Sequence, residues 1–167
     1  FIESLHRAAN FVIDTYKNKG KVLLAGNGGS AADSQHIAAE FIGRLNFDRD
    51  TLPAIALTAN TSNLTCIAND YGYDDIFVRQ MNALAQKNDC IIVYTTSGTS
   101  NNIIKLIENA KGKVKSIIAL TGEHTSDLEK YADIVISVKS KKTTRIQEIH
   151  AIAGHVICEC VEETLFR

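Results

Sequence analysis

The chain has 167 residues, of which 45% are apolar and 22% charged, a composition typical of a globular protein with a sizeable core. Its formal net charge of −1 gives no overall attraction to nucleic acid or to an anionic membrane, and no apolar run reaches the length of a membrane span. We therefore expect a single domain over residues 1–167, with no nucleic-acid or membrane partner.

The predicted elements alternate between helices and short apolar strands along the chain. Strands are predicted at 22–25, 53–57, 90–94, 115–120 and 134–138, and helices at 1–18, directly after the turn at 26–30, and at 58–68, 75–86, 103–107, 127–131 and 143–166. Polar or glycine-containing segments at 44–50, 69–73 and 139–142 are predicted to be loops or turns. Continuous apolar strands that alternate with helices predict an α/β fold, a doubly wound, five-stranded parallel sheet with helices on both faces.

A glycine-rich turn, Gly26-Asn27-Gly28-Gly29-Ser30, follows the first predicted strand. The glycines allow a ligand to approach the backbone, and the first N–H groups of the next helix favour an anion. The turn lacks the spacing of the common nucleotide-binding motifs, so a purely structural strand-to-helix turn is the alternative.

A second loop, residues 95–100, follows the third predicted strand and carries five hydroxyl side chains in six residues. Together with N–H groups at a helix start, such hydroxyls bind a phosphate without a fixed positive charge. Capping of the helix explains Ser100 alone, but it does not explain the other four hydroxyls.

His36 and Glu40 lie four residues apart on the helix after the glycine turn and therefore share one face. They are either a surface pair or a functional one, acting as a general acid and base or as metal ligands. On the last predicted helix, Gln147 and His155 interrupt an apolar pattern, and a satisfied core histidine is the alternative for His155. His150, on the same helix, is expected to be structural or exposed.

The four cysteines contain no C-x-x-C pair. We expect reduced, mostly buried thiols, as in a cytoplasmic protein.

Several segments together resemble the phosphoheptose isomerase branch of the sugar-isomerase, or SIS, family. The resemblance extends from Lys21 to the C-terminus and rests on AGNGGSAADSQHIAAE, PAIAL, ANDYG, TTSGTSNN, LTG and RIQEIHAIAGH. It implies a flavodoxin-like SIS domain, preceded in this family by a further N-terminal helix, and a cytoplasmic homotetramer with shared active sites. The implied reaction converts sedoheptulose 7-phosphate to D-glycero-D-manno-heptose 7-phosphate, the first step toward heptose for a bacterial lipopolysaccharide, capsule or other glycan.

The resemblance also implies roles for the residues that match the family's motifs. Substrate contacts are implied for Asn27, Gly28, Gly29, Ser30, Asn69, Asp70, Thr95, Thr96, Ser97, Ser100 and Gln147. One zinc ion per subunit is implied at His36, Glu40, Gln147 and His155.

Interconversion of a ketose and an aldose needs a base that moves a proton between C1 and C2 and an acid that serves the two oxygens. We expect Glu40 to act as the base and His155 as the acid. On a straight helix, Gln147 and His155 are separated by about 12 Å of rise and about 80° of rotation. A shared ion therefore requires side chains that lean together, a bent helix, or residues from different subunits.

Relatives with other functions share parts of this pattern. A non-catalytic SIS module that associates with the bacterial replication initiator has similar turns but lacks the glutamate and the late histidine, which are present here as Glu40 and His155. In transcription regulators, a sugar-phosphate sensor domain accompanies a helix-turn-helix segment, and none is found in this sequence. Isomerases of arabinose 5-phosphate or hexulose 6-phosphate are lesser alternatives.

Overall fold

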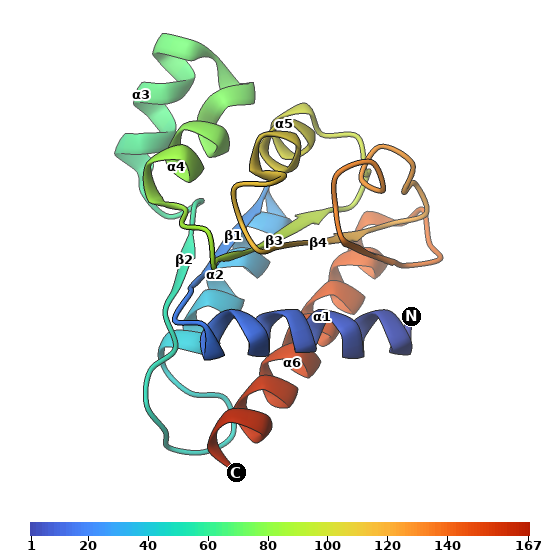
Figure 1. Cartoon of the computed structure of the whole chain (residues 1–167). Helices are drawn as coiled ribbons and strands as arrows, with labels where there is room; N and C mark the ends of the chain where they lie inside the picture. The colour runs from blue at the N-terminus through green and yellow to red at the C-terminus, as the bar shows by residue number, and fades with distance from the viewer.

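The computed structural model describes all 167 residues and contains a five-stranded parallel sheet with helices on both faces (Figure 1). The strands are β1 (Val22–Gly26), β2 (Ala54–Ala56), β3 (Cys90–Thr95), β4 (Ser116–Thr121) and β5 (Ile134–Ser137), in the spatial order β2-β1-β3-β4-β5. The helices are α1 (Ile2–Lys17), α2 (Gly29–Ile42), α3 (Thr61–Tyr71), α4 (Ile76–Leu84), α5 (Asn101–Ala110) and α6 (Thr143–Phe166), with a short 3-10 helix, η1 (Tyr73–Asp75), before α4. The predicted doubly wound parallel sheet is confirmed. None of the helices combines the length and the apolar character that crossing a membrane requires.

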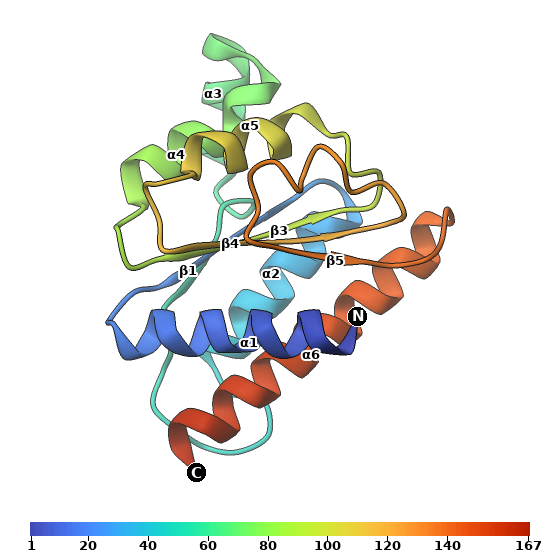
Figure 2. The same ribbon diagram turned by 45° about the vertical axis from the view of Figure 1, so that its right-hand side comes forward.

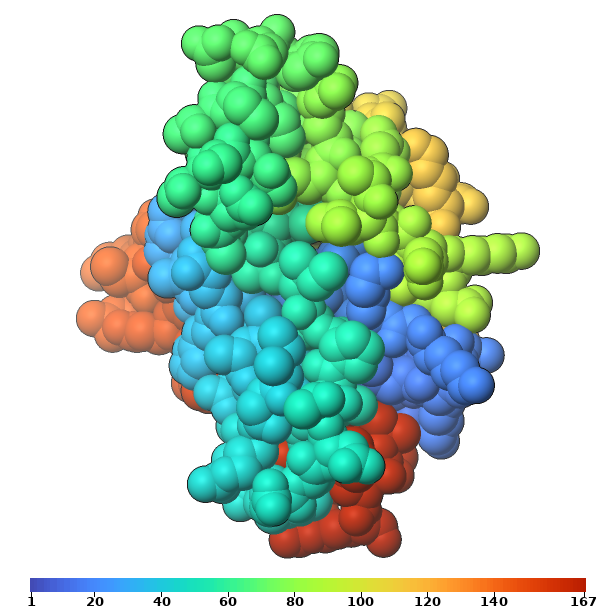
Figure 3. Space-filling model, turned by 90° about the vertical axis from the view of Figure 1, so that its left-hand side faces the viewer, coloured from blue at the N-terminus to red at the C-terminus, as the bar shows by residue number.

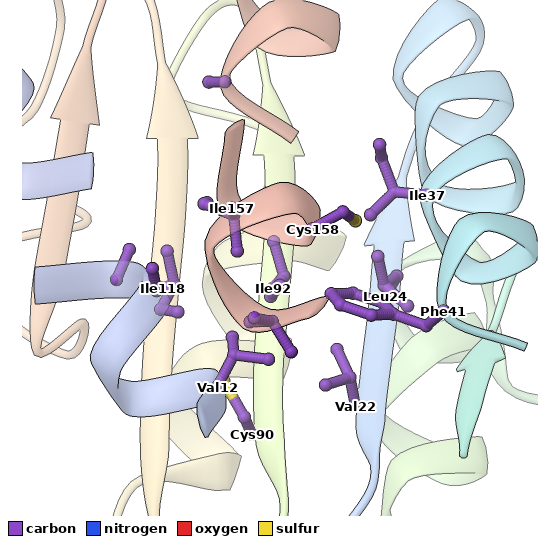
Figure 4. Packing of buried hydrophobic residues seen from close by; sticks show 14 of the residues in the cluster. Val12, Val22, Leu24, Ile37, Phe41, Cys90, Ile92, Ile118, Ile157 and Cys158 are labelled. Carbon is purple, nitrogen blue, oxygen red and sulfur yellow. The ribbon is translucent and has the colours of Figure 1, made fainter. Parts of the chain in front are cut away.

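The sheet lies between two layers of helices (Figure 2). It separates two hydrophobic cores, to which successive strand residues belong alternately. In β1, Val22 and Leu24 face the layer of α1, α2 and α6, whereas Leu23 and Ala25 face the layer of α3, α4 and α5. Figure 4 shows the first of these cores, where Ile157 of α6 packs over the sheet beside α2. Because both faces are covered, each central strand is buried along its whole length, which explains the continuous apolar runs in the sequence.

Helices α2 and α6 pack side by side on one face of the sheet and run in the same direction. Gln147 lies against Gly29 at the start of α2, and Glu162 accepts a hydrogen bond from the backbone of Leu45 just beyond its end. Gly154 marks a close approach, because an added Cβ would stand 2.6 Å from Cδ1 of Ile37. We call the line of contact between the two helices, which includes the contacts of Gly29 with Gln147 and of Ile37 with Gly154, the α2–α6 seam.

Two predictions of local structure are wrong. Asn69 and Asp70 do not form a turn but the end of α3, because the helix continues until Gly72, whose φ of +99° favours glycine. The segment 127–131 is not a helix but a series of hydrogen-bonded turns that places only Leu128 in the core. So short a segment forms too few backbone hydrogen bonds to offset the cost of starting a helix.

Candidate active site

The two loops predicted to bind the ligand lie side by side at the carboxyl edge of the sheet. The glycine-rich turn follows β1 and loop 95–100 follows β3, and these two strands are hydrogen-bonded neighbours. The chain leaves β1 toward α2 on one face and β3 toward α5 on the other, so the loops lie at the switch point in strand order. Between them is a cavity of about 50 Å³, lined by Asn27, Ser30, Tyr94, Thr95, Thr96 and Ser100.

Three hydroxyl groups of loop 95–100 form a triangle at the edge of this cavity, which Thr95 and Ser100 line and Ser97 does not. The side-chain oxygens of Thr95, Ser97 and Ser100 are 3.5 Å apart in every pair. An oxygen atom about 2 Å above the plane of this triangle would lie about 2.8 Å from all three hydroxyls, an ordinary O–H···O distance. Ser100 makes no side-chain capping bond to α5, so its hydroxyl can serve a ligand. The arrangement suits one oxygen of a phosphate group.

A wider, open hollow of about 410 Å³ adjoins the same loop on the side of β4 and β5. It is lined by Thr96, Ser97, Glu123, His124, Ser140 and Lys141. Lys141, from the predicted basic loop, supplies a positive charge next to the hydroxyl loop, and Glu123 opposes it in the same hollow. The hollow is therefore polar and mixed in charge, which suits a hydroxylated ligand.

His36, Glu40 and His155 come together on the exposed side of the α2–α6 seam. Nε2 of His36 lies 3.2 Å from both Oε1 of Glu40 and Nε2 of His155, and one ligand atom from each residue falls within 4.8 Å of the others. The two imidazole rings meet edge to face, with centroids 4.8 Å apart. Nitrogen and oxygen ligands of a tetrahedral zinc ion lie about 3.3 Å from one another. The two distances from His36 therefore match the ligand spacing of such an ion, and the third ligand atom lies within 4.8 Å of the others.

Gln147 lies apart from this cluster. Its side-chain amide lies directly against Gly29, where a Cβ would collide with it. Seven residues of α2, or about 10 Å of helix rise, separate Gly29 from His36. Gln147 therefore borders the glycine-rich turn and not the cluster. A substrate contact is also predicted for this residue. To join a metal at His36, its amide would have to move along the seam.

Two further polar residues, Asp33 and His150, lie beneath the α2–α6 seam, and neither is predicted from the sequence to belong to the site. Asp33 is one turn before His36, and its Oδ2 is buried without a hydrogen-bond partner. Burial raises the pKa of Asp33, although the nearby His36 acts in the opposite direction. His150 is fully buried beside Tyr94, with ring centroids 5.9 Å apart, and burial lowers its pKa to about 4. For Asp33, the signal in the sequence is its i,i+3 spacing from His36, which makes the two side chains neighbours on the surface of α2.

Asn69 and Asp70 lie on α3, which projects from the sheet beyond α4 (Figure 1) and stands above α2 on one face of the molecule (Figure 3). Both residues are exposed, Nδ2 of Asn69 donates to Oδ1 of Asp70, and neither lines a cavity beside the two loops. The neighbouring η1 reaches the glycine-rich turn, since the Tyr73 hydroxyl donates to Oδ1 of Asn27 over 3.0 Å. The structure therefore leaves these two predicted substrate contacts outside the pocket of their own chain.

Comparison with known proteins places these features in a family. The SIS domain family matches residues 2–122. Phosphoheptose isomerase from Aneurinibacillus thermoaerophilus is 50% identical over 98% of this chain and 82% of its own length. The structure of phosphoheptose isomerase GmhA from Neisseria gonorrhoeae superimposes with a TM-score of 0.90 and 38% identity, over 97% of this chain and 86% of that one.

A second solved structure, a phosphoheptose isomerase from Francisella tularensis, gives a TM-score of 0.91 at 35% identity, over 96% of this chain and 86% of that one. Identity of this extent over nearly the whole chain goes beyond a shared fold. The chain belongs to the SIS domain family and, within it, to the phosphoheptose isomerases.

Proposed function

We propose that the two loops bind the phosphate of sedoheptulose 7-phosphate while Glu40 and His155 isomerise its other end to D-glycero-D-manno-heptose 7-phosphate. The observation that carries the proposal is the layout of α2. Its start borders the small polar cavity, and the His36 and Glu40 side chains of the cluster lie about two and three turns farther along. This separation suits a sugar that carries its phosphate on C7 and reacts at C1 and C2.

In this mechanism the Glu40 carboxylate removes a proton from C1 of the ketose. The C–H electron pair forms the C1–C2 double bond, and His155 donates a proton to the carbonyl oxygen on C2, which gives an enediol. His155 then takes the proton from the hydroxyl on C1 as the new carbonyl forms there. Glu40 returns its proton to C2, so no proton is gained or lost overall. The hydroxyl loop holds the phosphate and contributes binding that is equal in the ground and transition states.

The same cluster is proposed to hold one zinc ion, through His36, Glu40 and His155, with Gln147 as a fourth ligand if its amide leaves Gly29. When bound, the ion would stabilise negative charge on the substrate oxygens. The spacing of His36 from Glu40 and from His155, which matches that of tetrahedral zinc ligands, supports this proposal. A carboxylate that binds zinc is a weaker base, so either the ligation by Glu40 would loosen during turnover or the ion would mainly organise the site.

Removal of metal is expected to abolish turnover. We expect about one zinc ion per chain in the purified protein, since three protein ligands typically hold a catalytic zinc. Chelation should remove the ion and the activity together, and added zinc should restore both. The measurement is metal analysis alongside the isomerase assay, with His36→Ala as a variant that should not retain the ion. Full activity in metal-free protein would contradict the metal's role.

Ser97→Ala is expected to raise KM about tenfold and to leave kcat nearly unchanged, because a hydrogen bond to a charged phosphate is lost equally in both states. Steady-state kinetics with sedoheptulose 7-phosphate provide the measurement. Ser4→Ala, on α1, is the matched control and should change neither constant. A loss confined to kcat would show that Ser97 acts on the chemical step instead.

The reaction itself is tested by incubating the protein with sedoheptulose 7-phosphate and following the product by NMR. Fructose 6-phosphate and ribulose 5-phosphate serve as competing substrates, and the heptulose should be converted fastest. Absence of conversion of any of the three would favour the alternative of a non-catalytic, protein-binding SIS module.

The domain organisation, oligomeric state and location of the enzyme, and the use of its product, are also proposals. A single SIS domain, a cytoplasmic homotetramer with shared active sites and a heptose product for lipopolysaccharide or capsule are proposed from the family resemblance. Two features support self-association: the apolar side chains of Ile42 and Ile152 are about half exposed near the His36 cluster, and α3 holds Asn69 and Asp70 away from their own pocket. The four cysteines are unpaired, as expected in a reducing compartment.

A further inference from the structure

The side chains of Asn27 and Asn102 form a reciprocal pair of hydrogen bonds. Nδ2 of each residue donates to Oδ1 of the other, and both distances are 2.9 Å. Asn27 belongs to the glycine-rich turn and is half-buried, whereas Asn102 lies in the first turn of α5 and is only 2% exposed. The pair therefore ties together two ligand loops that are 75 residues apart in the sequence.

This pair links the segments at which two helices start. Helix α2 begins at Gly29 and α5 at Asn101, and the cavity of about 50 Å³ is bordered by Ser30 on one side and Ser100 on the other. Each helix start offers unpaired N–H groups and the positive end of a helix dipole. Because no lysine or arginine lines this cavity, an anion in it depends on such donors from both sides.

Asn102 acts on the cavity from outside it. It is not among the lining residues, and its hydrogen bonds to Asn27 occupy the side chain that faces the glycine-rich turn. Tyr73 adds a third contact, because its hydroxyl donates to the same Oδ1 of Asn27. Asn27 is thus held on two sides, and its turn cannot move away from loop 95–100 without breaking the pair.

We propose that Asn102 is a positioning residue for the substrate phosphate: through Asn27 it holds the glycine-rich turn and the hydroxyl loop at the spacing that receives the phosphoryl group. This inference rests on the proposed function, because it takes the ligand of the cavity to be the phosphate of the sugar. It predicts that loss of Asn102 weakens phosphate binding, although Asn102 itself does not touch the phosphate.

The test compares Asn102→Ala with Asn101→Ala, which removes an exposed asparagine from the adjacent position of α5. Asn102→Ala is expected to raise KM for sedoheptulose 7-phosphate and the Kd for inorganic phosphate about tenfold each, with kcat within about twofold, since misplacement affects the binding of the phosphate rather than the distant reaction. Asn101→Ala should change none of these. Unchanged phosphate affinity in folded Asn102→Ala, or a fall in kcat at constant KM, would overturn the proposal.

A double-mutant cycle provides the second measurement. Asn27→Ala breaks the same pair from its half-buried partner, so it also serves if Asn102→Ala does not fold, as judged by circular dichroism. If the pair acts as one unit, Asn27→Ala should weaken phosphate binding at least as much as Asn102→Ala, and the double variant no more than Asn27→Ala alone. Additive losses, or unchanged phosphate affinity in Asn27→Ala, would overturn the proposal.

Calorimetric titration with inorganic phosphate separates this inference from the proposed function. If the unmodified chain binds phosphate but does not isomerise the heptulose, the proposed function fails and the titrations still decide the role of Asn102. If the unmodified chain binds no phosphate, the inference itself is overturned.

Discussion

Replacing Glu40 by glutamine is expected to lower kcat about 10³-fold, since a positioned general base contributes roughly 10²–10⁴-fold to such a reaction. Glutamine has nearly the same shape as glutamate but cannot accept the proton from C1. The Glu40 side chain is 22% exposed and its one contact at ion-pair distance is with His36, so the fold should be retained. Turnover of sedoheptulose 7-phosphate and exchange of the C1 proton with deuterated solvent, both followed by NMR, provide the measurement.

The role of Glu40 as base must be separated from its role as a metal ligand. Metal content measured on the same samples makes this distinction: lost turnover with retained zinc assigns Glu40 as the base, whereas loss of both assigns it first to the metal. Glu129→Gln, at an exposed position distant from the cluster, is the matched control and should behave like the unmodified chain. Residual turnover of Glu40→Gln within tenfold of the parent would remove Glu40 from the mechanism.

The fold could be predicted because the sheet is covered on both faces. Such strands must be apolar along their whole length, so CIIVY of β3 stands out in the sequence without any knowledge of its neighbours. The errors occur where local signals compete. Asn69 and Asp70 are typical turn residues, but α3 keeps its hydrogen bonds through them until Gly72 ends it.

The candidate site could be predicted only in part. The spacing of His36 and Glu40 on one helix is visible in the sequence, but the position of α6 beside α2 is not. Because the two helices run in parallel, Gln147 meets Gly29 and His155 meets His36. The eight positions from Gln147 to His155 on α6 therefore match the seven positions from Gly29 to His36 on α2. The rise of about 12 Å between Gln147 and His155 therefore places these two residues beside different parts of α2, the helix start and the position of His36.

Contacts between distant segments could not be predicted at all. Asn27 lies in one predicted ligand loop and Asn102 lies two residues beyond the other, yet nothing in either segment indicates that their amides pair. The same holds for Glu162, an acidic residue near the end of an amphipathic helix that reads as surface charge. Its partners come from the loop at 44–50, more than 100 residues earlier in the chain.

Arg49→Met is expected to destabilise the fold by about 3 kcal/mol, because breaking a buried ion pair leaves an unpaired charge. Nε of Arg49 donates to Oε1 of Glu162 over 2.9 Å, and the two side chains are 2% and 0% exposed. The guanidinium also donates to the backbone carbonyls of Glu40 and Phe41 in the last turn of α2. Thermal and denaturant unfolding provide the measurement, and a fall in Tm of roughly 6–12 °C corresponds to this loss.

Arg145→Met is the matched control for this prediction. Arg145 and Glu148 also form an ion pair, but their side chains are 65% and 52% exposed, so its loss should cost less than about 1 kcal/mol. Similar losses in the two variants would show that the burial of Arg49 and Glu162 does not determine the effect. The comparison holds the substitution constant and changes only the environment.

The effect of Arg49→Met should also depend on pH. Burial alone would raise the pKa of Glu162, but hydrogen bonds from the backbone of Leu45 and Asn46 and from Arg49 outweigh it and hold that pKa below its ordinary value of 4.5. A lowered folded-state pKa means that the carboxylate contributes its full stability above pH 4.5 and loses it as the pH falls through the folded-state value. The difference in unfolding free energy between the parent and Arg49→Met should therefore narrow below pH 4.5. A difference that stays constant into the acid range would mean that Arg49 stabilises the end of α2 through its carbonyl contacts rather than through the charge of Glu162.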